Sequence, residues 1–378
     1  MQLRLTHLSI LPLCLGFLLS TACKVNASCA DLGDPGCSSL LSLFWLKILK
    51  PRYYYATDQS GFVLQYSVNL ETGALTQIAP KLAVPSPSWM TTEINGKFIY
   101  TQNSTTVSQL RVTPGTGALV NLGDLTIAAT TLNGITYDAL QRFVFVSSSG
   151  GSGAVVTLRV SSSGLLTPIQ SFNPSTICNN NQGAAAHPGG KFLYCGNNTT
   201  IASRIIDGNT GALADGPNTL GVTGNIQTIG FDSGGNYLFV VTSTNVESYA
   251  VNQSTGALTL RSSLPFAAGS YSLTVFGNYV YASSNGLRTL SFDPNTGVLT
   301  SLATNASGGA NAFGISIEAQ GKFGYALNPG GGVLFTYARN SDGTMTTMNP
   351  QSGVTLGGVI ITGSMSSPIN EIFATDPM

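Results

Sequence analysis

A short pattern built around glycine recurs seven times along the 378-residue chain. In each copy a polar, turn-forming residue precedes the glycine, and a large apolar residue stands two positions after it. Successive glycines lie 44, 47, 47, 45, 41 and 46 residues apart, at Gly73, Gly117, Gly164, Gly211, Gly256, Gly297 and Gly343. A repeat of this length indicates a fold assembled from copies of one supersecondary unit.

Each repeat also contains β-like runs. A run of aromatic and β-branched residues, such as 97–101 (KFIYT), is followed by an alternating run, such as 107–112 (VSQLRV). Further copies of the aromatic run lie at 53–56, 142–146, 191–195, 237–240, 279–282 and 322–326. A third run follows each glycine, and a fourth, richer in small residues, precedes the next aromatic run. Four short strands in 41–47 residues make one blade of a β-propeller.

An open array of blades would leave sheet edges exposed, so we expect the ring to close. Residues 357–362 are a candidate inner strand for pairing with residues 52–56. Residues 370–375 (NEIFAT) look like an eighth copy of the aromatic run, and they either replace or flank residues 52–56. The predicted fold is therefore all-β, a seven-bladed β-propeller of four-stranded antiparallel blades over residues 52–378, closed by pairing of its N- and C-terminal strands.

Two further motifs carry a resemblance to a known family. Residues 187–194 read HPGGKFLY, and the tripeptides 66–68 (YSV) and 249–251 (YAV) lead into the glycine turns. In these features the sequence resembles the lactonase-type seven-bladed propellers, which include the propeller form of 6-phosphogluconolactonase, and the related YVTN-repeat propellers. The resemblance covers residues 52–378. It implies the fold more directly than an activity, because these motifs form turns and strands.

The first 22 residues have the pattern of an export signal, with an apolar stretch after Arg4 and His7. The ending LSTAC resembles the lipobox of bacterial lipoproteins, with Leu19 one place earlier than that motif prefers, and it makes Cys23 the lipidated residue. Plain secretion is the alternative. Residues 23–51 are then a tether, whose apolar stretch 38–50 forms a short helix either on the membrane surface or packed on the domain behind it.

The remaining cysteines suit an oxidising compartment. Cys29, Cys37, Cys178 and Cys195 are even in number, and the first two flank a turn that can bring their sulfurs together. A bridge between Cys178 and Cys195 requires the loop at Cys178 to lean inwards. No CxxC spacing occurs, so we expect no metal site.

The chain has few charges. Only 8% of its residues are Asp, Glu, Lys or Arg, and its formal net charge is zero, so no basic surface for nucleic acid is expected. No phosphate-cradling loop occurs, and we expect no cofactor. The predicted protein is a monomer in the bacterial cell envelope, on the outer membrane or cell surface, attached to the membrane through its lipid.

Opening a lactone requires a general base, an oxyanion donor and, for an anionic substrate, a cation. The resemblance implies that His, Arg and Glu side chains gather at one face of the channel in active members. The candidates here are weak. His187 lies in a turn where capping is the simpler role, and Glu247 fits either a strand or a site. Arg111 and Arg159 lie at equivalent positions just before a glycine turn, so they belong to the repeat pattern. Arg204 and Arg288 depart from that pattern. Glu93 and Glu318 follow inner strands and are expected to face solvent.

The residues that enter the inner strands are expected to surround one mouth of the channel. They are amide, hydroxyl and aromatic, and the candidate ligand-binding residues are Trp89, Asn133, Asn181, Gln182, Gln227, Tyr271, Asn311 and Phe313. Such a ring suits a neutral polar ligand, for example a glycan or a peptide. The alternative is that Asn and Ser occur here because loops require them.

Two functions follow from these features. The first is a non-catalytic binding or scaffold domain, whose partner is a glycan, a peptide or a protein of the envelope or host. The second is a lactone-hydrolysing enzyme of the propeller family. The scarcity of histidine and of clustered arginine favours binding.

Overall fold

The structure, a computed structural model, describes residues 52–58, 61–93, 96–127, 132–148, 155–172, 178, 184–266, 272–284, 286–305, 313–318, 320–328, 333–348 and 373–374. The chain divides into two compact units, residues 1–50 and 51–378, and every described residue lies in the second. The predictions for the export signal, Cys23, Cys29, Cys37 and the apolar stretch 38–50 fall outside the described residues.

The strands of the first three blades follow the predicted repeat. Blade 1 contains β1 (Arg52–Asp58), β2 (Phe62–Val68), β3 (Leu75–Gln77), β4 (Leu82–Ala83) and β29 (Phe373–Ala374). Blade 2 contains β5 (Trp89–Thr92), β6 (Phe98–Gln102), β7 (Thr106–Val112) and β8 (Leu119–Thr126). Blade 3 contains β9 (Leu132–Tyr137), β10 (Phe143–Ser148), β11 (Val155–Val160) and β12 (Leu166–Phe172).

The other four blades each have four strands. Blade 4 contains β13 (Ala184–Ala186), β14 (Phe192–Asn197), β15 (Thr200–Ile206) and β16 (Leu213–Gly221). Blade 5 contains β17 (Ile226–Phe231), β18 (Tyr237–Thr242), β19 (Asn245–Val251) and β20 (Leu258–Pro265). Blade 6 contains β21 (Leu273–Phe276), β22 (Tyr279–Ser284), β23 (Gly286–Phe292) and β24 (Leu299–Asn305). Blade 7 contains β25 (Phe313–Ile317), β26 (Phe323–Asn328), β27 (Val333–Arg339) and β28 (Met345–Thr347).

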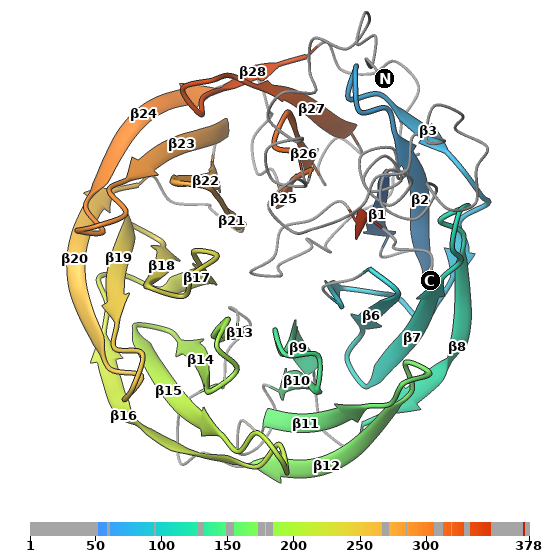
Figure 1. Ribbon diagram of the computed structural model, residues 1–378, viewed down its shortest axis with the longest axis horizontal. Helices are drawn as coiled ribbons and strands as arrows, with labels where there is room; N and C mark the ends of the chain where they lie inside the picture. The colour runs from blue at the N-terminus through green and yellow to red at the C-terminus, as the bar shows by residue number, and fades with distance from the viewer. Residues whose placement is uncertain are drawn as a thin grey trace, which may run out of the picture. The chain divides into compact units, whose positions relative to one another are not determined.

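The predicted seven-bladed, all-β propeller is confirmed. Within each sheet neighbouring strands pair antiparallel, and the sheets stand around a common centre with their first strands inside and their fourth strands at the rim (Figure 1). The aromatic runs form the second strand of each blade, which is covered on both faces by neighbouring blades. That double burial explains why these strands are apolar along their length rather than alternating.

The ring closes through the two ends of the propeller. Arg52 pairs with Ala374 and Tyr53 with Phe373, so the C-terminal strand β29 flanks β1 on its inner side. The closing strand therefore comes from the 370–375 segment, and it flanks the 52–56 run rather than replacing it. The other predicted partner, residues 357–362, lies outside the described residues.

The repeated glycine joins each blade to the one before it. All seven glycines have a positive φ, and a Cβ on Gly117 would lie 2.3 Å from the ring of Tyr53 in the preceding blade. In five junctions a buried tyrosine hydroxyl also donates to the glycine carbonyl, as from Tyr55 to Gly117 at 2.6 Å. Glycine is needed both for the backbone conformation of the turn and for the approach of the ring.

The outermost strands carry β-bulges. In blades 2 to 6 the register between the third and fourth strands shifts at equivalent places, as between Gln109 and Leu110 in blade 2. A bulge bends the exposed edge and interrupts its row of free backbone groups. The blades are thereby protected against pairing edge to edge with other chains.

Because strands alternate in direction, their connections lie on two faces. We call the face with the connections from first to second and from third to fourth strand the turn face. The opposite face, with the connections from second to third strand and between blades, is the loop face. The glycine turns and His187 lie on the turn face, and the entries to the inner strands lie on the loop face.

Candidate functional site

His187 lies in the turn between β13 and β14 and is buried. The Gly189 N–H donates to its Nδ1 at 2.9 Å, so Nδ1 carries the lone pair. Nε2 therefore carries the proton and donates to the carbonyl of Gly235 in blade 5, also at 2.9 Å. The rings of Phe192 and Phe231 pack edge-on against the imidazole. These are the contacts of a turn cap.

Carboxylates have the same place as His187 in other blades. Glu318 accepts the N–H groups of Gln320 and Lys322 at 2.7 and 2.5 Å, and Glu93 accepts the Lys97 N–H at 3.2 Å. Both side chains are buried, with 0% and 5% of Glu318 and Glu93 exposed. The prediction that Glu93 and Glu318 face solvent is wrong, because their carboxylates turn inward to cap backbone N–H groups of the turn that follows.

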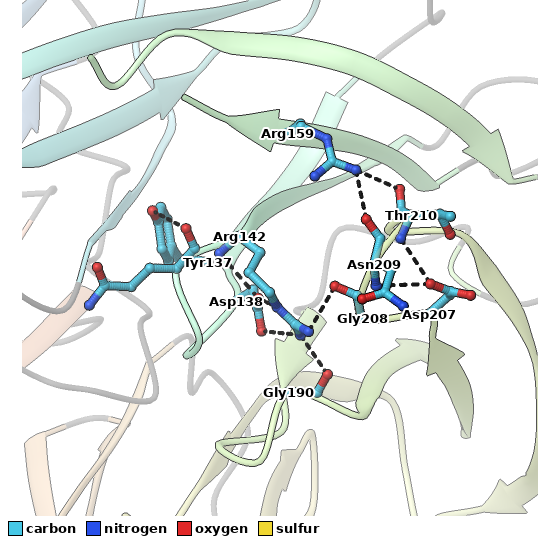
Figure 2. Close-up of polar contacts among 10 residues, drawn as sticks. Tyr137, Asp138, Arg142, Arg159, Gly190, Asp207, Gly208, Asn209 and Thr210 are labelled. Carbon is cyan, nitrogen blue, oxygen red and sulfur yellow. Dashed lines mark hydrogen bonds and ion pairs between the residues drawn. The ribbon is translucent and has the colours of Figure 1, made fainter. Parts of the chain in front are cut away.

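Arg142 and Arg159 join blade 3 to blade 4 through the carbonyls of the turn 208–210. Arg142 pairs with buried Asp138 at 2.7 Å and donates to the carbonyls of Gly190 and Gly208 (Figure 2). Arg159 donates to the carbonyl of Asn209 at 2.9 Å. Both guanidinium groups also lie over the Phe143 ring, 5.2 Å from its centroid. The sequence analysis missed Arg142, whose position in the turn gave no sign of a partner in the next blade.

Arg204 and Arg288 also lie at blade junctions. Arg204, on β15, pairs with Asp215 on β16 at 2.5 Å and lies over Phe172 of blade 3. Burial lowers its pKa, and the Asp215 carboxylate partly offsets this. Arg288, on β23, lies over the Phe266 ring and donates to the Pro265 carbonyl at 2.9 Å. These two candidates are on third strands, away from the inner strands.

Glu247 is a buried carboxylate on β19, with 2% of the residue exposed. The Tyr249 hydroxyl donates to its Oε2 at 2.5 Å, and Ser263 Oγ donates to its Oε1 at 3.2 Å. The N–H of Thr223 approaches Oε1 at 3.4 Å from the loop before β17. The carboxylate thus holds part of the loop face in place from within the sheet.

The described part of the predicted ligand ring lies on the loop face. Trp89 begins β5, Gln227 is the second residue of β17, and both are half-buried. Trp89 packs against the apolar core between blades 2 and 3. Two residues before Gln227, the N–H of exposed Asn225 donates to Ser243 Oγ at 3.0 Å. Thr244 Oγ1 donates to the Thr223 carbonyl at 3.1 Å. This patch, residues 223–227 with Ser243 and Thr244, is uncharged.

The side chains of the other predicted ring residues are not among those that the structure describes. Asn133 and Phe313 lie on β9 and β25, but only their backbone is described. Asn181, Gln182, Tyr271 and Asn311 fall outside the described residues. Their proximity to Trp89 and Gln227 stays a prediction.

A disulfide joins Cys178 to Cys195 on β14, with their Cα atoms 5.2 Å apart. Both residues are buried in the core between blades 3 and 4. Cys178 therefore does lie inwards, as the bridge requires. The bridge ties the connection between these blades to the second strand of blade 4.

Two further features concern metals and membranes. Among the described residues, no three His, Cys, Asp or Glu side chains gather where they could hold a metal ion. The same residues contain no helix with the length and hydropathy needed to cross a bilayer.

The family comparison agrees with the resemblance seen in the sequence. Residues 54–187 match the family model described as lactonase, 7-bladed beta-propeller. Among curated proteins, none matches the sequence.

Solved structures share the fold at low sequence identity. A Bacteroides uniformis protein with a provisional 6-phosphogluconolactonase assignment superposes with a TM-score of 0.71 and 17% identity, over 83% of this chain and 97% of that one. The periplasmic gluconolactonase of Pseudomonas aeruginosa superposes with a TM-score of 0.70 and 15% identity, over 82% of this chain and 97% of that one.

A third similar structure has no assigned activity. This protein from Desulfotomaculum acetoxidans, described as functionally unknown, gives a TM-score of 0.65 and 12% identity, over 83% of this chain and 99% of that one. At sequence identities this low the superpositions establish a shared fold only, so the chemistry has to be argued from the residues of the site. The chain folds as a seven-bladed β-propeller, and residues 54–187 of it match the lactonase propeller family model.

Proposed function

We propose that the chain is a cell-envelope lipoprotein, lipidated at Cys23, whose lactonase-like propeller binds a neutral polar ligand or protein partner without chemical turnover. One observation carries the absence of turnover, whereas lipidation rests on the sequence motif that ends at Cys23. The ionisable side chains that lactone opening would recruit are committed to structural contacts: His187, Glu93 and Glu318 cap turns, Arg204 and Arg288 lie at blade junctions, and Glu247 supports a loop.

The character of the loop face supports a neutral ligand. Asn225, Gln227, Ser243 and Thr244 offer amide and hydroxyl groups, and the described patch contains no carboxylate or cation at its surface. Amides and hydroxyls both donate and accept hydrogen bonds, as do the hydroxyls of a glycan or the backbone of a peptide. The patch is therefore suited to recognition through hydrogen bonds rather than through charge.

Hydrolysis of a sugar lactone is the second candidate. The family match over residues 54–187 and the similarity to a periplasmic gluconolactonase favour it. That neighbour is named as a periplasmic enzyme, so a lactonase can act outside the cytoplasm. The predicted export of this chain is therefore compatible with an unphosphorylated lactone as substrate. The argument against it is that His187, Glu93, Glu318, Arg204, Arg288 and Glu247 are held in structural contacts.

A lactone panel separates the two functions. The exported chain, with Cys23→Ser to prevent lipidation, is tested on sugar and acyl lactones beside a heat-unfolded sample. We expect no turnover above the unfolded sample. Turnover above it would overturn the binding proposal, because a non-catalytic propeller adds nothing to the spontaneous reaction.

Binding is tested on an array of neutral glycans and peptides. We expect retention that is weakened in Asn225→Ala and Gln227→Ala, which are on the loop face, and unchanged in Glu71→Gln, an exposed residue of a turn on the opposite face. Equal retention by all three variants would show that the ligand does not use this patch.

Lipidation is tested separately. Cells that express the chain should incorporate labelled palmitate into it, and Cys23→Ala should abolish the label. An unlabelled wild-type chain would overturn lipidation at Cys23.

A further inference from the structure

The turn between the first and second strands is built alike in five blades. Its first residue donates its N–H to the aromatic residue that begins the second strand, and its carbonyl accepts an N–H from three residues ahead. The first residues are Glu93, Asp138, His187, Asp232 and Glu318. Four blades thus use a carboxylate where blade 4 uses an imidazole.

The imidazole joins two blades through both of its nitrogens. Nδ1 accepts the Gly189 N–H of its own turn, and Nε2 donates to the Gly235 carbonyl in the matching turn of blade 5. The fit at Gly235 is close, since a Cβ there would lie 2.5 Å from Nε2. Gln253 donates to the same carbonyl at 2.7 Å.

From this geometry we infer that His187 is an acid-sensitive latch between blades 4 and 5. The latch requires a neutral ring, because Nδ1 must accept. A second proton can only go to Nδ1, where it faces the Gly189 N–H and removes the acceptor. Two donors then oppose each other in a buried turn, so the turn has to open. A carboxylate at the same place keeps its acceptors until much lower pH.

Three charged side chains surround the latch. Lys191 follows in the same turn and disfavours the imidazolium, whereas Asp232 in blade 5 favours it. Arg142 of blade 3 donates to the Gly190 carbonyl and is paired with Asp138. Burial is the largest influence, and it lowers the pKa of His187 below its usual value.

The direction of the pH effect follows from linkage. The unfolded chain binds a proton at a pKa near 6.5, and the folded chain binds it at lower pH. The contribution of His187 to stability is therefore complete above pH 6.5 and is lost as the pH falls toward the folded-state pKa. The loss is largest in the turns 187–190 and 232–235, where the ring makes its contacts. This inference needs neither the lipid nor the ligand of the proposed function.

The first test is urea unfolding of the exported chain at pH 7.5, 6.5 and 5.5. The only other histidine, His7, belongs to the predicted export signal, so the exported chain has one imidazole. We expect the unfolding equilibrium constant to rise between pH 6.5 and 5.5, by up to about tenfold per pH unit. His187→Gln cannot take up the proton, and its unfolding should change much less over this interval. Equal pH dependence in both proteins would overturn the latch.

A second test applies even where the variant does not fold. Amide exchange of the wild-type chain is compared at pH 7.5 and 5.5, after correction for the intrinsic exchange rate. Protection should fall in peptides containing residues 187–190 and 232–235, and it should be retained in the matching turn of blade 7, which Glu318 caps. Unchanged protection in blade 4, or an equal loss in blade 7, would overturn the proposal.

Discussion

The hydroxyl of Tyr325 in blade 7 donates a 2.8 Å hydrogen bond to the carbonyl of Gly73 in blade 1, 252 residues earlier. The Phe323 ring packs on the same glycine, where a Cβ would lie 2.5 Å from it. Side chains therefore join the last blade to the first by the contact used at four of the other junctions, in addition to the β1–β29 strand pair.

Removal of this hydroxyl should destabilise the propeller. Tyr325→Phe leaves the buried Gly73 carbonyl without its donor, and we expect the free energy of unfolding to fall by about 1–2 kcal/mol. Urea unfolding followed by tryptophan fluorescence measures the change. Tyr194→Phe, which loses the equivalent 2.7 Å bond to Gly256 inside the ring, is the matched control and should cost a similar amount. An unchanged unfolding midpoint in Tyr325→Phe would show that the last junction is not held in this way.

The repeat in the sequence predicted this architecture because each copy repeats the residues that its junction requires. A glycine at positive φ and an aromatic ring recur at fixed spacing in all seven copies, and a tyrosine recurs in five, so counting copies gave the number of blades. The closing strand was harder to assign, because residues 370–375 and residues 357–362 both read as β-like. The structure pairs Phe373 and Ala374 of the first segment with β1, and the second segment lies outside the described residues.

Blade 3 lacks the tyrosine that donates to the glycine carbonyl of the next blade, and introducing one should stabilise the protein. Phe145 has the place of the tyrosines, and its cross-strand neighbours Thr136 and Thr157 have no hydrogen-bond partner for Oγ1 among the described residues. Phe145→Tyr places a hydroxyl where the other junctions bond the glycine carbonyl, here Gly211. We expect a gain of about 0.5–1.5 kcal/mol, measured as a higher urea midpoint.

Phe239→Tyr in blade 5 is the matched control for that gain. There Ser248 Oγ already donates to the Gly297 carbonyl at 2.6 Å, so a second donor has little to add. A similar gain in both variants would contradict the explanation, because the gain would then come from the added hydroxyl itself and not from a new hydrogen bond to the Gly211 carbonyl.

Two glycines with the same backbone conformation should differ in their tolerance of alanine. Gly297 and Gly115 have φ values of +76° and +78°, but a Cβ would lie 2.4 Å from the Tyr237 ring at Gly297 and has nothing within 4 Å at Gly115. Gly115→Ala should cost about 1 kcal/mol from the left-handed conformation alone. Gly297→Ala adds the displacement of a packed ring and should cost about 1–3 kcal/mol more. Equal thermal midpoints would show that the rings do not require glycine.

The candidate site was harder to predict than the fold. A charged residue in a turn or on a strand gives no sign of whether it faces a ligand or the next blade, because its partner comes from a repeat more than 40 residues away. Arg142 reaches the Gly190 and Gly208 carbonyls over 48 and 66 residues, and its sequence neighbours gave no hint of either. The burial of Glu93 and Glu318 was misjudged for a related reason, since a carboxylate that caps its own turn looks like an exposed loop residue in the sequence.

The disulfide between Cys178 and Cys195 should contribute to the stability of the propeller. The two residues are 17 apart in the sequence, and a cross-link over such a loop reduces the entropy of the unfolded chain by the equivalent of about 3 kcal/mol. We therefore expect the Cys178→Ala, Cys195→Ala double variant to unfold at lower urea concentration than the oxidised wild type. Cys29→Ala, Cys37→Ala is the control, because both residues precede β1, and it should leave the unfolding of the propeller unchanged. A cost below about 1 kcal/mol in the first variant would show that packing of blades 3 and 4, rather than the bridge, holds Cys178 in the core.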